Sequence, residues 1–459
     1  MEDKTMKKSV YGIAALLLAL VACNKIETEK QVAENTEGIP FSATVSLGNN
    51  AATKALAENG STITATWAEG EKVALIHNGV SDEMTVSSVS GGSATISGTI
   101  TGTPADGDAV TIIYPSSAAD GTTGNIKANL LYAQNGLLTG TGSISESFDV
   151  RKGEGTLKVN GTATLSGGVS LTNQFAIFKF TVKNHDGSAA ISAKPLTITI
   201  GTQDYVITPA SATDVLYAAL PAVSEEKVSF DATDGSDRTY TCAKHSASFE
   251  AGKYYQSTLK MREYVDLGIV VGGKIIKWAT CNVGASKPED YGDYFAWGET
   301  SGYNSGKTNF SWTTYFDTSD GGTTFTKYAT DKKTVLDFED DAARASWGGS
   351  WRMPTDEEWT WLLENCTWTW TDNYNGAGVA GRIVTSNVSG YKGNTIFLPA
   401  AGYRYHTSLR SAGSFGYYCS SSLRGGLSDA AWGVRFYSEE VYRYGYNRFY
   451  GFSVRPVSE

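Results

Sequence analysis

Thiol and imidazole side chains are the groups in this sequence best suited to metal binding or nucleophilic catalysis. Their spacing, however, predicts neither a metal site nor a catalytic site. The chain has five cysteines and four histidines. The histidines are scattered and no C-x-x-C pair occurs, so the ligand spacing of a zinc site is missing. No G-x-S-x-G elbow, nucleotide-binding loop or carboxylate pair with catalytic spacing is found either. We therefore predict a protein with no metal, no cofactor and no enzymatic activity.

Cys23 is set apart from the other cysteines by the residues before it. Lys7 and Lys8 precede an apolar run from Val10 to Ala22 that is too short to span a bilayer. The sequence Leu20-Val21-Ala22-Cys23 resembles the lipobox of bacterial lipoproteins. The resemblance implies a signal peptide at residues 1–22, lipidation of Cys23 and a polar tether at residues 23–37. More than one acyl chain gives stable anchoring, so the expected partner is the outer membrane and the expected location the cell surface.

The elements that would position a site are mainly short strands. Apolar alternation bounded by turn residues predicts strands at the following places: Ile63–Trp67, Val73–His77, Ala94–Ile100, Ala109–Tyr114, Phe175–Val182, Leu196–Ile200, Leu216–Leu220 and Lys253–Leu259. A chain of 459 residues should contain several domains. We predict a mostly β protein, with β-sandwiches at residues 38–165 and 166–262 and an α+β domain at residues 263–459. The net charge of −10, without a basic stripe, argues against nucleic-acid binding.

Three motifs in the first half of the chain resemble one known family. They are Thr53-Lys54-Ala55, Trp67-Ala68-Glu69-Gly70-Glu71-Lys72-Val73 and Ala251-Gly252-Lys253-Tyr254-Tyr255. Together they resemble the fimbrillin-like lipoproteins of Bacteroidetes over roughly residues 35–262. The resemblance implies two stacked transthyretin-like sandwiches and a role as stalk, anchor or tip subunit of a pilus, with fimbrial subunits as partners.

The last part of the chain contains the turn and helix signals. The glycine pair Gly272-Gly273 predicts a hairpin turn, and a helix is expected near Phe338–Trp347. A second helix should begin at Thr355, because Thr355-Asp356-Glu357-Glu358 forms a capping box. We expect Trp351 and Trp359 to fill a core and Arg352 to pair with acidic groups.

These residues belong to a longer set of motifs. The segments Gly349-Ser350-Trp351-Arg352-Met353-Pro354-Thr355-Asp356-Glu357-Glu358-Trp359, Tyr417-Tyr418-Cys419-Ser420-Ser421-Ser422 and Gly451-Phe452-Ser453-Val454-Arg455-Pro456-Val457 occur in this order. They resemble C-type-lectin-fold domains related to formylglycine-generating proteins, the Fibrobacter major paralogous domain, and variable proteins that retroelements diversify. The resemblance covers roughly residues 264–459 and implies a C-type-lectin-like domain.

The segment from Tyr403 to Tyr450 has the composition of a binding surface. It contains nine of the 25 tyrosines and six arginines but no lysine. Tyrosine and arginine are the residues of binding hot spots. By similarity to the diversified proteins, we expect contacts with a protein or glycan ligand from Tyr405, His406, Arg410, Phe415, Arg424, Arg435, Tyr437, Tyr442, Tyr444, Tyr446 and Tyr450. The run Tyr442–Tyr450 lacks apolar alternation and is predicted to be an exposed loop, although ordinary strand-face aromatics remain the alternative.

Two other functions stay open at this stage. A fimbrial tip or anchor subunit would use the same domains structurally. A formylglycine-generating thiol enzyme would need a reactive cysteine pair near the C-terminal core, where only Cys419 lies. Cys281 and Cys366 are interpreted as a disulfide pair or as buried thiols. The tripeptides Glu-Pro-Asn, Gln-Pro-Asp and Trp-Asn-Asp are absent, so calcium-dependent sugar binding is not predicted.

Overall fold

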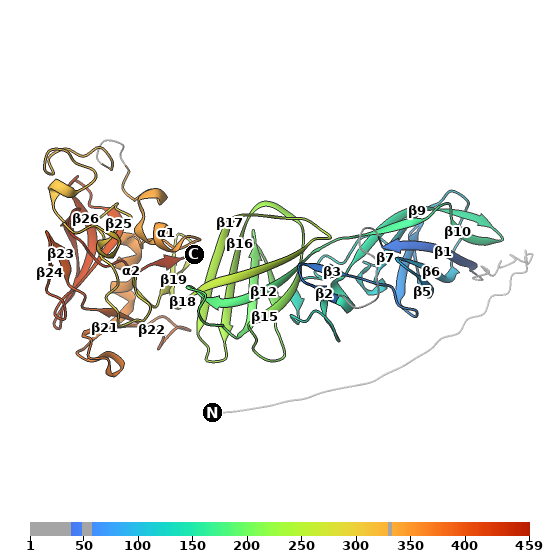
Figure 1. Cartoon of the computed structure of the whole chain (residues 1–459), viewed down its shortest axis with the longest axis horizontal. Helices are drawn as coiled ribbons and strands as arrows, with labels where there is room; N and C mark the ends of the chain where they lie inside the picture. The colour runs from blue at the N-terminus through green and yellow to red at the C-terminus, as the bar shows by residue number, and fades with distance from the viewer. Residues whose placement is uncertain (1–37, 48–56, 329–332) are drawn as a thin grey trace, which may run out of the picture.

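The computed structural model describes residues 38–47, 57–328 and 333–459. Cys23 and the Thr53-Lys54-Ala55 motif lie outside these ranges. The described chain is mostly β, as predicted, and its sheets follow one another along an elongated molecule (Figure 1). No helix within these ranges is both long and apolar enough to cross a membrane.

The first sheet, which we call the N-terminal barrel, closes on itself. In the described residues its strands are β1 (Ile39–Leu47), β4 (Lys72–His77), β5 (Val80–Ser90), β6 (Ser93–Ile100), β7 (Ala109–Tyr114), β9 (Arg151–Asn160), β10 (Thr162–Leu165) and β11 (Val169–Asn173). Closure comes from β1, which pairs with β11 on one edge and with β6 on the other. Although β11 was expected in the second sandwich, its pairing places it here, because Val169–Asn173 supplies the missing neighbour of β1 and β9.

The second sheet, the middle sheet, follows directly. Its strands within the described ranges are β8 (Ala133–Gln134), β12 (Ala176–Asn184), β13 (Ala193–Ile200), β14 (Gln203–Ile207), β15 (Val215–Leu220), β16 (Val223–Asp234), β17 (Thr239–Phe249) and β18 (Tyr254–Val271). Phe180 on β12 lies 5.5 Å from Phe230 on β16, ring centroid to ring centroid, so the sheet folds over and its two halves face each other. Buried apolar side chains from Phe41 to Met261 form one connected core through both sheets.

A hairpin also ties the first two sheets together. Strands β2 (Ala57–Asn59) and β3 (Thr62–Thr64) pair with each other, and Glu58 reaches the middle sheet. Its carboxylate accepts hydrogen bonds from Lys179 (2.8 Å), Tyr217 (2.8 Å) and Tyr254 (3.0 Å). Hydrogen bonding to Lys179 is the largest cause of the lowered pKa of Glu58. The carboxylate therefore stays charged and links the hairpin to three strands.

The C-terminal body begins without a linker. Strand β18 spans 18 residues, from the middle sheet across the boundary expected at residue 262. The Gly272-Gly273 turn then leads into β19 (Lys274–Ala279), as predicted, and β28 (Val457–Ser458) pairs with β19. Other strands of this body are β20 (Cys366–Thr371), β21 (Gly381–Ser386), β22 (Thr395–Pro399), β23 (Tyr403–Tyr405), β24 (Ser408–Arg410), β25 (Gly416–Leu423), β26 (Ala430–Phe436) and β27 (Val441–Asn447).

Two helices support these strands. Helix α2 (Asp356–Asn365) starts at the predicted capping box, in which Thr355 accepts from the Glu358 amide and Glu358 from the Thr355 amide. The helix expected near Phe338–Trp347 is shorter. A 3-10 turn at Phe338–Asp340 is followed by α1 (Ala342–Trp347). Asp341 separates the two because it adopts an extended conformation and caps α1 through the Arg344 amide.

Candidate binding face

The candidate site is built on the sheet β25–β26–β27. The register sets Arg435 opposite Tyr442 on β27 and opposite Tyr417 on β25. Directly opposed side chains share a face, and side chains alternate along a strand, so Tyr444 and Tyr446 project from the same face as Tyr442. The reverse side of the sheet packs into the core, where the following residues are buried: Tyr418, Val434 and Phe436.

The run Tyr442–Tyr450, predicted to be an exposed loop, is mainly a strand. β27 covers Val441–Asn447 and pairs with β26 along its whole length. The prediction failed because it counted aliphatic alternation, whereas here tyrosines alternate with Arg443 and Gly445. Tyr444 is 51% exposed, but Tyr446 is half-buried, and burial raises the pKa of its phenol. The exposure of this run is therefore smaller than expected and is confined to Arg443 and Tyr444.

Arg435 joins several of the predicted residues. Its guanidinium carbon lies 4.6 Å from the ring centroid of Phe415 and 5.6 Å from that of Tyr442. The ring of Tyr437 lies 5.1 Å from Phe415. A cation held between aromatic faces is stabilised by their quadrupoles. Four predicted residues thus form one half of the site.

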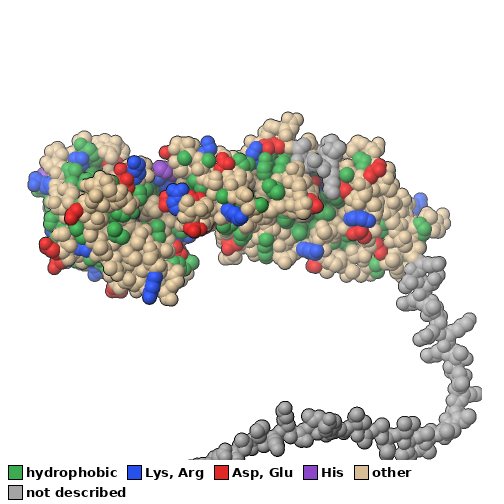
Figure 2. Space-filling model, turned by 90° about the horizontal axis from the view of Figure 1, so that it is seen from below, with side chains coloured by type: hydrophobic (Ala, Val, Ile, Leu, Met, Phe, Trp, Pro, Cys, Tyr) green, Lys and Arg blue, Asp and Glu red, His purple; other side chains and the backbone are tan. Residues whose placement is uncertain are grey.

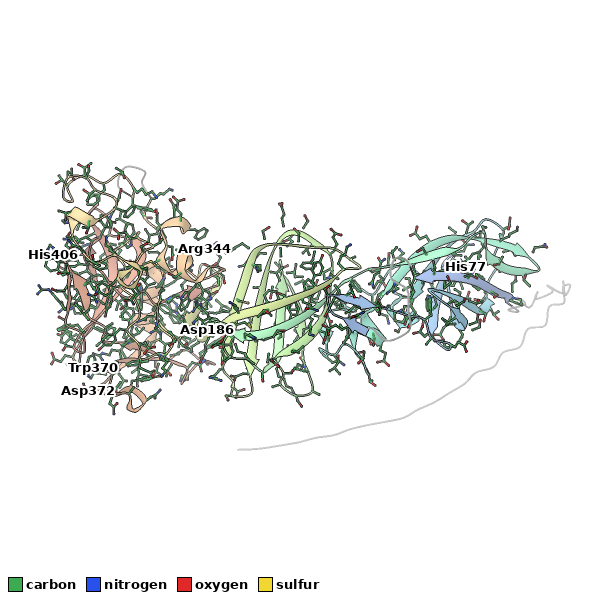
Figure 3. The ribbon with its side chains drawn as sticks, in the orientation of Figure 1. His77, Asp186, Arg344, Trp370, Asp372 and His406 are labelled. Atoms are coloured by element: carbon green, nitrogen blue, oxygen red, sulfur yellow. The ribbon has the colours of Figure 1, made fainter. Side chains whose placement is uncertain are left out.

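The other half is a hairpin at the far end of the molecule. His406 sits in the turn between β23 and β24, exposed and at a φ of 51°, and Figure 3 labels it at the end of the molecule opposite β1. The guanidinium of Arg410 lies 5.4 Å from the ring centroid of Tyr405, and the rings of Tyr405 and Tyr450 are 5.5 Å apart.

One buried ring that the prediction missed, that of Phe452, connects these halves. Phe452 lies 5.9 Å from Tyr450, 5.0 Å from Tyr446 and 5.4 Å from Tyr417, centroid to centroid. Phe452 belongs to the last of the three C-terminal motifs, Gly451–Val457. Arg424 lies 5.9 Å from the ring of Tyr444, but it also lies over Trp432, the ring that Arg443 covers on the reverse side of the sheet. All eleven predicted residues therefore lie in one continuous network, which we call the Tyr/Arg face: Tyr405, His406, Arg410, Phe415, Arg424, Arg435, Tyr437, Tyr442, Tyr444, Tyr446 and Tyr450.

The Tyr/Arg face combines three arginines with one carboxylate at its border, that of Glu440, which accepts a hydrogen bond from Tyr437 at 3.1 Å. Arg410, Arg424 and Arg435 make no ion pair with any residue in the described part of the chain, and each lies over an aromatic ring instead. Arg443 differs, because its side chain belongs to the reverse side of the sheet and binds Asp356 at 2.9 Å. Guanidinium groups without a carboxylate retain donors for an incoming acceptor.

Residues of the Gly349–Trp359 motif pack against the reverse side of the sheet that carries the face. Arg352 binds Glu358 at 2.6 Å and Glu459 at 2.8 Å, which confirms the predicted pairing with acidic groups. Trp351 and Trp359 are buried, as predicted. The indole nitrogen of Trp359 donates to the carbonyl of Cys419 on β25 at 3.1 Å. The motif therefore positions the central sheet.

The thiols do not form the proposed disulfide. Cys281 and Cys366 are free, as are Cys242 and Cys419. Cys366 packs into the core with Trp359, whereas Cys281 lines a separate cavity near Arg262, so the two lie in different environments. Cys419 is buried, and burial raises the pKa of its thiol. A buried, protonated thiol is a poor nucleophile, which weighs against the thiol-enzyme alternative.

Three carboxylates in the described residues come close together without making a persuasive metal site. Asp337, Glu339 and Asp340 bring oxygen atoms within 4.8 Å of one another. Lys327 binds Asp340 at 2.7 Å and Glu339 at 3.2 Å, and Lys333 binds Asp337. The ammonium groups already compensate these charges.

Comparison with known proteins gives solved structures only. No family model and no curated protein matches the chain. A fimbrial protein of Bacteroides ovatus is 11% identical, aligned over 92% of this chain and 99% of its own, with a TM-score of 0.23. A fimbrial assembly protein of Parabacteroides distasonis is 14% identical over 50% of this chain and 94% of its own, with a TM-score of 0.29. The chain is similar to these proteins, but TM-scores this low do not establish a common fold.

Proposed function

We propose that this protein is a surface-displayed adhesin or receptor that binds a protein or glycan through the Tyr/Arg face. The observation that carries the proposal is the gathering of all eleven predicted residues into one network with uncompensated arginines. Rigid aromatic side chains offer large contact area at small entropic cost, and arginine offers several donors in fixed geometry. Catalysis has no part in this proposal.

The position of the face suits display. The hairpin with His406 lies at one end of the elongated molecule and β1 at the other (Figures 1 and 3). A chain that reaches β1 from a membrane anchor would therefore leave the Tyr/Arg face as the distal surface. The proposal includes a lipid on Cys23, attachment to the outer membrane, a C-type-lectin-like C-terminal body and, at the face, diversification by a retroelement.

The test is a binding screen that compares the protein with a variant altered only at the Tyr/Arg face. The protein from residue 24 onward would be applied to arrays of host and bacterial proteins and glycans. The double variant Tyr444→Ala/Arg424→Ala would be applied to the same arrays. Tyr444 is the most exposed tyrosine of the face, so its loss should not disturb the core. We expect an identified ligand to bind the variant about 10-fold or more weakly.

The matched control is Tyr132→Ala. Tyr132 is a 38% exposed tyrosine of the N-terminal half, far from the face, and its loss should leave binding unchanged. Equal weakening by both variants, or full binding by the face variant, contradicts the proposal. Failure to bind any ligand, together with assembly into filaments, would instead favour a fimbrial tip or anchor subunit.

A further inference from the structure

A seam in the middle sheet opens where two neighbouring strands separate. β17 and β18 pair only from Thr239 to Thr241, opposite Tyr264 to Arg262. Beyond this point β17 continues beside β16 and β18 beside β12. A cavity of about 540 Å³ lies between the diverging strands. Cavities of this size accommodate small organic ligands.

The floor of the seam is aromatic. Phe178, Phe180 and Phe230 line it from β12 and β16, and Phe249 and Tyr255 line it from the two separating strands. The ring of Phe178 lies 4.9 Å from those of both Phe249 and Tyr255. An apolar body would therefore lose contact with water against several ring faces.

The rim of the seam is cationic, in a protein whose net charge is −10. Lys244, Lys260 and Arg262 all line the cavity, and no Asp or Glu is among its lining residues in the described chain. None of the three cations makes a hydrogen bond or ion pair with another described side chain. Asp186 lies at the junction with the C-terminal body (Figure 3). It affects the pKa of Arg262 only through a longer-range electrostatic interaction.

Arg262 is the most enclosed of these cations. Its guanidinium carbon lies 3.8 Å from the ring centroid of Trp347. Burial lowers the pKa of Arg262 to about 10, and the neighbouring charges of Cys281 and Asp186 offset this only in part. A desolvated guanidinium without an anion is costly to the free protein, and a bound carboxylate would relieve that cost through two parallel hydrogen bonds.

The C-terminal body closes one end of the seam. Trp347, Gly349 and Trp351 line the cavity, and the carbonyl of Gly349 contacts the ring of His245 on β17. The surface narrows where this body meets the rest of the molecule (Figure 2). A ligand in the seam would therefore touch both the middle sheet and the C-terminal body.

We propose that the seam binds an amphipathic carboxylate of fatty-acid size, with its apolar body on the phenylalanine floor and its carboxylate on Arg262. Lys244 and Lys260 add attraction at the open rim. This site is separate from the Tyr/Arg face and does not depend on the function proposed for it.

The experiment measures binding of 11-(dansylamino)undecanoate to the protein from residue 24 onward by dansyl fluorescence, with dodecanoate and dodecanol as competitors. Dodecanoate should displace the probe, and dodecanol should compete at least about 10-fold less well because it lacks the charge. Arg262→Gln should weaken dodecanoate binding about 10- to 100-fold and leave dodecanol competition unchanged.

Two further proteins make the result decisive. Lys244→Gln/Lys260→Gln changes only exposed side chains, so it should fold and should still weaken dodecanoate binding several-fold. Arg410→Gln is the matched control, because Arg410 also lies over a ring without an ion pair but far from the seam. The proposal is overturned if dodecanoate does not bind, if dodecanol competes equally, or if the seam variants bind like the control. Binding of an extended acidic peptide in place of dodecanoate overturns it in favour of strand addition.

Discussion

Asp317→Asn should loosen the long connection that packs beside the Tyr/Arg face. Asp317 and Arg448 form an ion pair at 2.9 Å, and both side chains are fully buried. The second oxygen of Asp317 accepts from the amides of Thr326 (2.9 Å) and Lys327 (2.8 Å). Arg448 also donates to the carbonyl of Tyr328 at 3.1 Å. One pair therefore joins the end of β27 to the connection that precedes α1.

The size of the effect follows from burial. Asparagine keeps the shape of Asp317 but removes its charge, which leaves the guanidinium of Arg448 buried and uncompensated. Breaking a buried pair in this way costs about 3–5 kcal/mol. Because Arg448 lies between the rings of Trp297 and Phe325, it cannot easily move into water. We expect the loss of stability to appear first in residues 317–328.

Hydrogen exchange of the Thr326 and Lys327 amides, together with urea unfolding, measures this loss. Glu339→Gln is the control, because its carboxylate pairs with Lys327 while 73% exposed and should contribute less than about 1 kcal/mol. The double variant Asp317→Asn/Arg448→Met should be more stable than Asp317→Asn alone, since it removes the orphaned charge. A change below about 1 kcal/mol in Asp317→Asn, or no rescue in the double variant, would refute the reasoning.

Three further predictions concern the C-terminal body. Thr355→Ala removes the side-chain cap of α2 and should lower the free energy of unfolding by about 1 kcal/mol, whereas unchanged urea unfolding would contradict the role of the capping box. Burial raises the pKa of Tyr418 from near 10 to about 12, so the stability from its neutral phenol is present below pH 10 and is lost as the pH rises toward 12. Tyr418→Phe should therefore lose stability less steeply than the wild type over that window, and equal slopes in pH-dependent unfolding would count against this. Because Cys281 and Cys366 are free thiols, a reductant should leave the melting temperature unchanged, and a drop would reveal a disulfide.

Local sequence signals predicted much of this fold. The strand at Ala109–Tyr114 has the expected bounds, and the Gly272-Gly273 turn and the Thr355 capping box are where the sequence placed them. Each of these features depends on residues close together in the chain. Steric freedom at glycine, side-chain capping and period-two alternation act locally, so a single sequence reveals them.

Features that depend on distant residues were not predictable in the same way. Arg448 and Asp317 are 131 positions apart, and nothing in either neighbourhood identifies the partner. β11 joins the N-terminal barrel through pairing with β1, more than a hundred residues earlier. At the Tyr/Arg face, the predicted residues lie close together, but their shared network depends on Phe452, whose role is set by the tertiary fold.

The continuous strand β18 has a mechanical consequence. If the distal face is held by a ligand while the other end is held at a membrane, the pulling force passes along the backbone of β18 from one sheet to the next. Its parallel ladder with β12, from Ile177 and Tyr254 to Asn184 and Met261, would then be loaded along many hydrogen bonds together rather than opened one at a time. We therefore expect the junction between the middle sheet and the C-terminal body to stay intact under tension instead of bending or separating.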